Sequence, residues 1–244
     1  MKSIPLRNPP IAEALIDVRV EPRPGASVND LLAMHERLGE GYGVPQPRYR
    51  LTQQLSVGTE STPLEPPTRD LDGQAFWSLD RRRVVQVQTT GFSLSILRPY
   101  KNWDELRAEA HARWLDYVEV MAPQRVVRIA TRYINRLELP LPTAEIKDWL
   151  LTYPELGPDV PQLLGEFLMR VVVPLAHATG IVTQASELPT DPTKLPVVLD
   201  IDVFRAAEFT PRSDTLWSAL DELREEKNTL FFGSITERTG DLYR

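Results

Sequence analysis

The chain has 244 residues and no cysteine, which excludes disulfides, thiolate metal sites and cysteine nucleophiles. Its 28 basic and 34 acidic residues give a net charge of −6, which argues against the overall positive field of a general nucleic-acid-binding protein but leaves room for a local basic patch. There is no run of about 18 apolar residues that would predict a membrane span, and the first residues carry no secretory segment, so the sequence predicts a cytoplasmic protein.

The first half of the chain predicts a short helix followed by several strands. Residues 11–22 alternate apolar and polar side chains, as a strand with one buried face does. A helix begins near Ser27 or Asn29 and ends in the glycine-rich residues 39–43. Further strands are predicted over 47–59 and, two or three times, within 74–99, and residues 61–73 are predicted to form a loop.

The clearest helix covers residues 102–121. Asn102 is its predicted N-cap. Apolar residues at helical spacing form one stripe along it, namely Trp103, Leu106, Ala110, Trp114, Tyr117, Val118 and Met121.

The second half repeats this order of elements. It predicts a strand over 125–139, a short helix that begins near Thr143, strands over 164–176, 180–188 and 195–206, and a final helix over 214–227. Lys227 is predicted to lie in the last turn of that helix. The tail that follows, with Phe231, Phe232 and Ile235, is predicted to pack back onto the body.

The similar order of elements predicts an internal duplication, with units at 1–122 and 123–244. The predicted fold class is α+β, in which one antiparallel sheet, continuous through both units, is covered by two long helices. The same order of elements occurs in saddle-shaped duplicated folds such as that of the TATA-binding protein. Such a likeness of topology does not transfer function.

Three arginines recur at every fourth position of the strand over 125–139. Arg128, Arg132 and Arg136 therefore share one face, whereas Tyr133 and Asn135 lie on the other. Two interpretations are open: the row is a binding surface, or it pairs with carboxylates. For Asn135, capping of backbone groups in a neighbouring loop is the expected role, and a ligand contact is the alternative.

Asp200 and Asp202 share a face of a later strand. Two carboxylates at this spacing can bind a divalent cation, or they can pair with arginines across a sheet, and pairing is favoured. The three histidines have no metal-ligand spacing, and no phosphate-binding or nucleophile motif occurs. The sequence therefore predicts no catalytic residue, no metal site and no cofactor.

Five segments together resemble a sporadically distributed, uncharacterised prokaryotic protein family. They are NPPIAEALIDVR (8–19), GFSLSILRPYKNWDEL (91–106), RIATRYINRLELP (128–140), LDIDVF (199–204) and KNTLFFGSIT (227–236). The Asn-Pro-Pro-Ile, Arg-Tyr-Ile-Asn and Ser-Ile-Thr motifs are its most distinctive marks. The resemblance implies a stand-alone bacterial or archaeal protein and brings no activity with it. The patchy distribution of the family suggests an association with mobile genetic elements or defence islands.

Three functions compete. The favoured one is a non-enzymatic interaction protein, antitoxin-like or defence-associated, whose partner is another protein. The second is a nucleic-acid-binding protein that uses the arginine face. The third is an enzyme or a small-ligand or metal-binding protein with a pocket built from Arg132, Asn135, Asp200 and Asp202. No membrane partner is expected, and the sequence does not indicate an oligomeric state.

Overall fold

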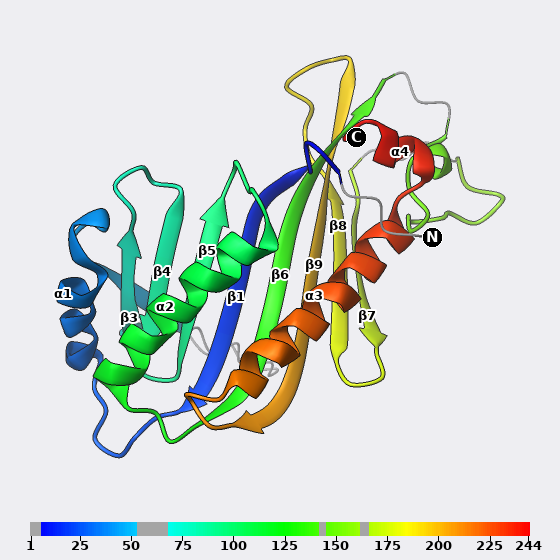
Figure 1. Cartoon of the computed structure of the whole chain (residues 1–244). Coiled ribbons are helices and arrows are strands. Elements are labelled where there is room, and N and C mark those ends of the chain that lie inside the picture. Colours follow the sequence, from blue (N-terminus) through cyan, green and yellow to red (C-terminus); the bar gives the residue numbers. More distant parts are fainter. Residues whose placement is uncertain (1–5, 53–67, 142–144, 162–165) are drawn as a thin grey trace, which may run out of the picture.

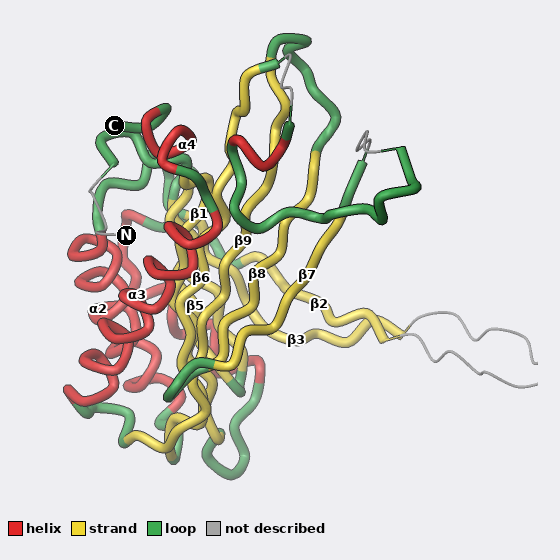
Figure 2. The backbone as a smooth tube through the Cα atoms, turned by 90° about the vertical axis from the view of Figure 1, so that its right-hand side faces the viewer, coloured by secondary structure: helices red, strands yellow, loops and turns green. Residues whose placement is uncertain are grey.

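The computed structural model describes residues 6–52, 68–141, 145–161 and 166–244. Within these residues the chain folds into one open antiparallel sheet with two long helices packed on one side of it (Figures 1 and 2). The strands are β1 (Ile11–Glu21), β2 (Gln46–Thr52), β3 (Thr68–Trp77), β4 (Arg83–Gln88), β5 (Gly91–Leu97), β6 (Arg125–Pro140), β7 (Leu168–Pro174), β8 (Thr179–Ser186) and β9 (Lys194–Phe209). The helices are α1 (Met34–Leu38), α2 (Trp103–Met121), α3 (Asp214–Ser234) and α4 (Glu237–Asp241), and short 3₁₀ turns cover η1 (Val28–Ala33), η2 (Gly39–Gly41) and η3 (Ile146–Asp148).

The sheet has nine strands in the order β2-β3-β4-β5-β1-β6-β9-β8-β7. The predicted α+β class and the antiparallel sheet under two long helices are confirmed. β1 and β6 lie side by side at the centre (Figure 1), and the long β9 pairs with β6 from Val126 to Pro140. Odd-numbered residues of β6 from Ile129 onward face the helices and are buried, whereas most even-numbered residues face the side without helices.

The helix α2 forms as its sequence predicts. The Asn102 side chain accepts a hydrogen bond from the Glu105 backbone N–H at 2.8 Å, which satisfies one of the free donors of the first turn. The helix ends at Ala122, whose backbone is left-handed (φ 41°) and whose N–H donates to the Val118 carbonyl at 2.9 Å. Every residue of the predicted apolar stripe is buried.

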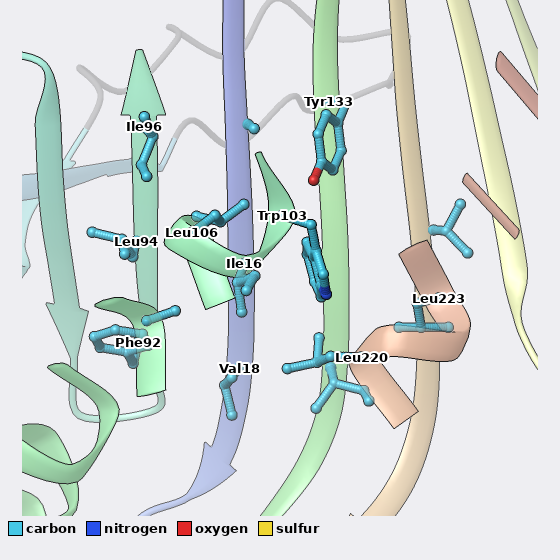
Figure 3. Close-up of a cluster of buried hydrophobic side chains, with 14 of the residues drawn as sticks. Ile16, Val18, Phe92, Leu94, Ile96, Trp103, Leu106, Tyr133, Leu220 and Leu223 are labelled. Carbon is cyan, nitrogen blue, oxygen red and sulfur yellow. The ribbon is translucent and has the colours of Figure 1, made fainter. Parts of the chain in front are cut away.

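The core lies between the sheet and α2 and α3. Figure 3 shows side chains of β5, β1, β6 and α3 meeting there, among them Phe92, Ile16 and Leu220. Trp114 is fully buried, stacks near Tyr117, and donates its indole N–H to the Pro211 carbonyl at 2.7 Å. A tryptophan in the core needs such a partner, because an unpaired buried N–H is costly.

Two predicted elements differ in the structure, and a third is described only in part. Residues 68–73 are not a loop but the start of β3, since their backbone pairs with β2 even though their side chains are mostly exposed. The predicted strand 47–59 is β2 as far as residue 52, and its remainder lies outside the described residues. The predicted helix within 26–43 is broken into η1, α1 and η2, with Gly39 left-handed at φ 69°.

The short helix predicted from Thr143 is wrong in its described part. In this described part the single turn η3 forms, and the residues after it make backbone hydrogen bonds with the C-terminal end of α3 and the residue that follows it. Leu150 forms an isolated bridge with Ile235, and the Leu151 N–H donates to the Ser234 carbonyl at 2.9 Å. These backbone groups are therefore used between segments and are not free for a local helix.

The end predicted for the last helix is also wrong. α3 continues seven residues beyond Lys227 to Ser234, because the buried stripe of the helix continues as well. Its buried positions along this stripe are Leu216, Leu220, Leu223, Lys227, Phe231 and Ser234, spaced by three or four residues throughout. Lys227 thus occupies a core position in the interior of the helix.

Candidate functional site

The arginine row lies on the side of the sheet without helices, and each of its members is paired. Arg132 forms a bidentate pair with Asp200, with Nε and Nη2 at 2.8 and 2.6 Å from the two carboxylate oxygens. Arg128 contacts Asp17 at 3.0 Å and Asp202 at 3.6 Å. Arg136 lies 2.9 Å from Glu187 and 3.5 Å from Glu138. The carboxylate pairing favoured for the row is therefore present.

The charges of this face largely compensate one another. The hydrogen bonds that Arg132 donates to Asp200 raise the pKa of Arg132, which keeps its guanidinium charged. Burial raises the pKa of Asp202, while Arg128 and Arg132 oppose this effect. Asp200 is engaged by both nitrogens of an arginine fork, a geometry that lysine cannot reproduce. The interpretation of Asp200 and Asp202 as a divalent-cation pair has no support from these contacts. Among the described residues, no group of three potential ligands is placed to hold a metal ion.

Tyr133 and Asn135 lie on the other face of β6, toward α3. Asn135 is buried and its amide nitrogen donates to the Leu199 carbonyl at 3.0 Å and, more weakly, to the Tyr133 carbonyl at 3.3 Å. Asn135 thus bonds to backbone groups as expected, but these groups belong to strands β9 and β6 and not to a neighbouring loop. The sequence-predicted residues therefore separate into two groups, the charged row on one side of the sheet and Tyr133 with Asn135 on the other, and the predicted pocket of Arg132, Asn135, Asp200 and Asp202 does not form.

Tyr133 and Asn135 instead line a cavity of about 230 Å³ between the N-terminal segment, the start of α2, β6 and α3. We call it the Lys227 pocket. Its lining residues are Leu6, Pro9, Pro10, Ile11, Tyr100, Lys101, Asn102, Trp103, Tyr133, Asn135, Arg224, Lys227, Asn228, Phe231 and Phe232. These described lining residues include three cationic side chains and no carboxylate. Lys101 and Arg224 form ion pairs with Glu105 and Glu225, which lie outside this lining. Lys227 is thus the cation of the described lining that has no ion pair.

Two tyrosine hydroxyls meet at this pocket. The oxygens of Tyr100 and Tyr133 are 3.0 Å apart, and the rings pack edge to face with centroids 5.6 Å apart. Burial raises the pKa of both phenols, most strongly for Tyr133, so both stay protonated at neutral pH. One of them donates to the other, which leaves one hydroxyl hydrogen for a different acceptor.

Lys227 is the most unusual group in the pocket. Its side chain reaches from α3 so that Nζ lies 3.8 Å from the centre of the Tyr133 ring and donates to the Asn228 side-chain oxygen at 2.7 Å. The residue is 8% exposed, and no carboxylate in the described part of the chain forms an ion pair with it. Burial, assisted by Arg224 and opposed by Glu225, lowers the pKa of Lys227 from 10.5 to about 7.

Four of the five segments that carry the family resemblance converge on this pocket. They contribute Pro9 to Ile11, Tyr100 to Trp103, Tyr133 with Asn135, and Lys227 with Asn228. The fifth, 199–204, supplies the partners of the arginine row on the opposite side of the sheet. Sequence reasoning placed Tyr133 and Asn135 among the site residues but missed Lys227 and Tyr100. The signal for Lys227 was the apolar stripe of α3, which continues on both sides of it.

A second hollow, of about 520 Å³, lies between α2 and α3 and includes Trp103, Arg107 and Asp221. Its charged groups already pair with one another, for example Arg107 with Asp221 at 3.0 Å. In contrast to the Lys227 pocket, it offers no buried cation that lacks a carboxylate partner.

No known family model matches this chain, and no curated protein matches it. The resemblance carried by the five segments therefore stays a prediction. No helix in the described ranges is both long and apolar enough to cross a membrane.

Proposed function

We propose that the protein binds a small anionic molecule in the Lys227 pocket. The observation that carries this proposal is a buried lysine that lines a cavity without any carboxylate in its described lining. Burying an ammonium group without a partner costs several kcal/mol, so a chain that needed only a core would place leucine or methionine at this position of the stripe. Such a cost is typical of functional sites, where a ligand supplies the missing partner.

The chemistry of the walls defines the ligand class. Lys227 favours a carboxylate or a similar anion, and Tyr100 can donate a hydrogen bond to an oxygen acceptor. Arg224 and Lys101, which pair with Glu225 and Glu105, add positive charge at the wall that these carboxylates partly offset. Pro10 and Phe231 supply apolar contacts. The volume of about 230 Å³ lies below the roughly 300–1,000 Å³ of pockets that hold drug-sized ligands. A compact metabolite with one anionic end fits this description.

Thermal unfolding with a panel of small carboxylates, 2-oxo acids and phosphates tests the proposal. A ligand at about 100 times its Kd stabilises the native state by about 2.7 kcal/mol, which raises Tm by roughly 5–10 °C for a protein of this size. Lys227→Met should abolish the shift, whereas Lys194→Met, which changes an exposed lysine on β9, should keep it. A shift that survives Lys227→Met places the ligand elsewhere and contradicts the proposal.

Partner binding is the second candidate function, and an edge strand favours it. β7 forms one edge of the sheet and exposes Leu168 (75%) and Val172 (52%). An exposed apolar edge can accept a strand from another protein. Val172→Lys should then remove a specific co-purifying protein, whereas Leu79→Lys, at an exposed leucine outside the strands, should not. The nucleic-acid interpretation is less favoured, because the arginines it needs are engaged by carboxylates.

We also infer that the halves 1–122 and 123–244 arose by duplication. The support is the order of the strands on the two sides of the β1–β6 pair. β5, β4 and β3 follow outward from β1, while β9, β8 and β7 follow outward from β6. In each half the strand next to the central one is followed by a long helix, α2 after β5 and α3 after β9. A saddle topology would have this arrangement.

A further inference from the structure

We propose that Lys227 binds its ligand covalently, by condensing with the carbonyl group of a small 2-oxo acid to form an imine. This inference rests on the proposed anion-binding function and names the substrate class of the same pocket. It is carried by the combination of a buried amine without a carboxylate partner, a pair of tyrosine hydroxyls in the same cavity, and a described lining without a carboxylate.

The first requirement is an amine with a free lone pair. The groups that face Lys227 are Arg224 and Glu225 on its own helix, Tyr133 from β6, and Asn228, whose oxygen accepts one N–H. With a pKa of about 7, close to half of the Lys227 side chains are neutral at pH 7, compared with on the order of one in 10³ for an ordinary lysine. Lysines desolvated in this way are the ones that form Schiff bases.

The second requirement is proton transfer. The nitrogen lone pair attacks the carbonyl carbon, the carbonyl π bond opens onto oxygen, and a carbinolamine results. Both hydrogens of the neutral amine then leave with the carbonyl oxygen as water, and a C=N bond remains, so the step needs no oxidant or reductant. The Tyr100–Tyr133 pair, with oxygens 3.0 Å apart and both phenols protonated, can deliver a proton to the departing hydroxyl and regain one from the nitrogen.

The third requirement is selectivity for a 2-oxo acid over a neutral aldehyde. A carboxylate next to the carbonyl would meet Arg224 and Lys101 at the wall. There it would share these cations with Glu225 and Glu105, their present partners. Because its amine is buried, Lys227 also differs in reactivity from an exposed lysine. The chain has five lysines in total, Lys2, Lys101, Lys147, Lys194 and Lys227, so an adduct can be assigned to one residue by peptide mapping.

Reductive trapping tests the inference. The full chain is incubated at pH 7 with pyruvate or glyoxylate and sodium borohydride, which reduces an imine to a stable secondary amine, and is then analysed by intact mass and peptide mapping. We expect one saturable adduct on Lys227, formed at least about tenfold faster than on any exposed lysine. Lys227→Met should lose it, Tyr100→Phe should form it more slowly, and Lys194→Met should keep it.

Lactate separates this inference from the proposed function, because it has the carboxylate but no carbonyl. Saturable lactate binding that depends on Lys227, without any trapped 2-oxo acid adduct, leaves the anion site standing and overturns the imine. Adducts spread evenly over the exposed lysines overturn the imine as well. If the 2-oxo acids form no adduct, the imine fails, and if in addition no carboxylate or phosphate of the panel binds, the proposed anion site fails with it.

Discussion

Replacing Lys227 by methionine should make the protein more stable at neutral pH, and the gain should fade as the pH rises. The side chain is buried in the stripe of α3 beside apolar residues, and methionine fills a similar volume without a charge. In the native state the pKa of Lys227 lies near 7, and in the unfolded chain it returns to its ordinary value of 10.5. Between these two pH values the unfolded chain binds a proton that the native protein does not.

The sign follows from this difference. Where the unfolded state binds more protons, stability rises with pH, so the cost of burying Lys227 is full below pH 7 and disappears as the pH approaches 10.5. A tenfold change in proton affinity corresponds to about 1.4 kcal/mol, so the displacement from 10.5 to about 7 corresponds to a cost of about 5 kcal/mol at low pH. About 3 kcal/mol of that cost should be relieved between pH 7 and pH 9.5.

Chemical denaturation at both pH values, followed by tryptophan fluorescence, measures the effect. The free energy of unfolding of Lys227→Met minus that of the wild type should shrink by about 3 kcal/mol from pH 7 to pH 9.5. This range stays below the ordinary pKa of tyrosine, and other titrating groups are common to both proteins and cancel. Lys194→Met, at an exposed position, should give a difference that does not change with pH. If the Lys227→Met difference is also constant, Lys227 keeps an ordinary pKa and the reasoning about its environment is wrong.

The remaining predictions concern the fold. Trp114→Ala should lower the free energy of unfolding by about 3–5 kcal/mol in denaturant titrations, because the fully buried indole leaves a large cavity, and a loss below about 1 kcal/mol would contradict this. Arg132→Lys and Asp200→Asn should be non-additive in a double-mutant cycle, since each removes the same bidentate pair, and additivity would show that the pair contributes nothing. Gly73→Ala should destabilise strongly, because its Cβ would meet a backbone oxygen of β4, whereas Gly233→Ala in α3 has open space and should stabilise slightly.

Local patterns predicted the elements whose stabilising contacts are close in sequence or follow one period. The Asn102 cap and the stripe through Trp114 specify α2, and the alternation around Tyr133 specifies β6. These two inferences needed no knowledge of which strands are neighbours. The pairing of Arg132 with Asp200 was favoured because opposite charges on facing strand positions attract, and it required that the two strands be neighbours, as β6 and β9 are.

The errors arose where tertiary contacts override local preference. Lys227 resembles a C-terminal helix residue, because a lysine followed by Asn228 suits the last turn, yet the buried Phe231 carries the helix onward. Residues 68–73 are polar enough for a loop, but their backbone is held by β2. The Lys227 pocket itself joins four segments that are distant in the chain. No single period encodes that convergence.

The central pair of strands also determines the order in which the protein can be completed during synthesis. β1 pairs with β6 from Glu21 with Arg125 to Ile11 with Asn135, separations of 104 and 124 residues. At about 5–20 residues per second, a ribosome needs roughly 5–25 s to supply the partner of β1. Until then β1 has only β5 beside it, and its other edge is a row of open backbone donors and acceptors. A nascent chain that stalls before β6 therefore exposes a long unpaired strand edge, the feature that makes partly folded chains prone to aggregate.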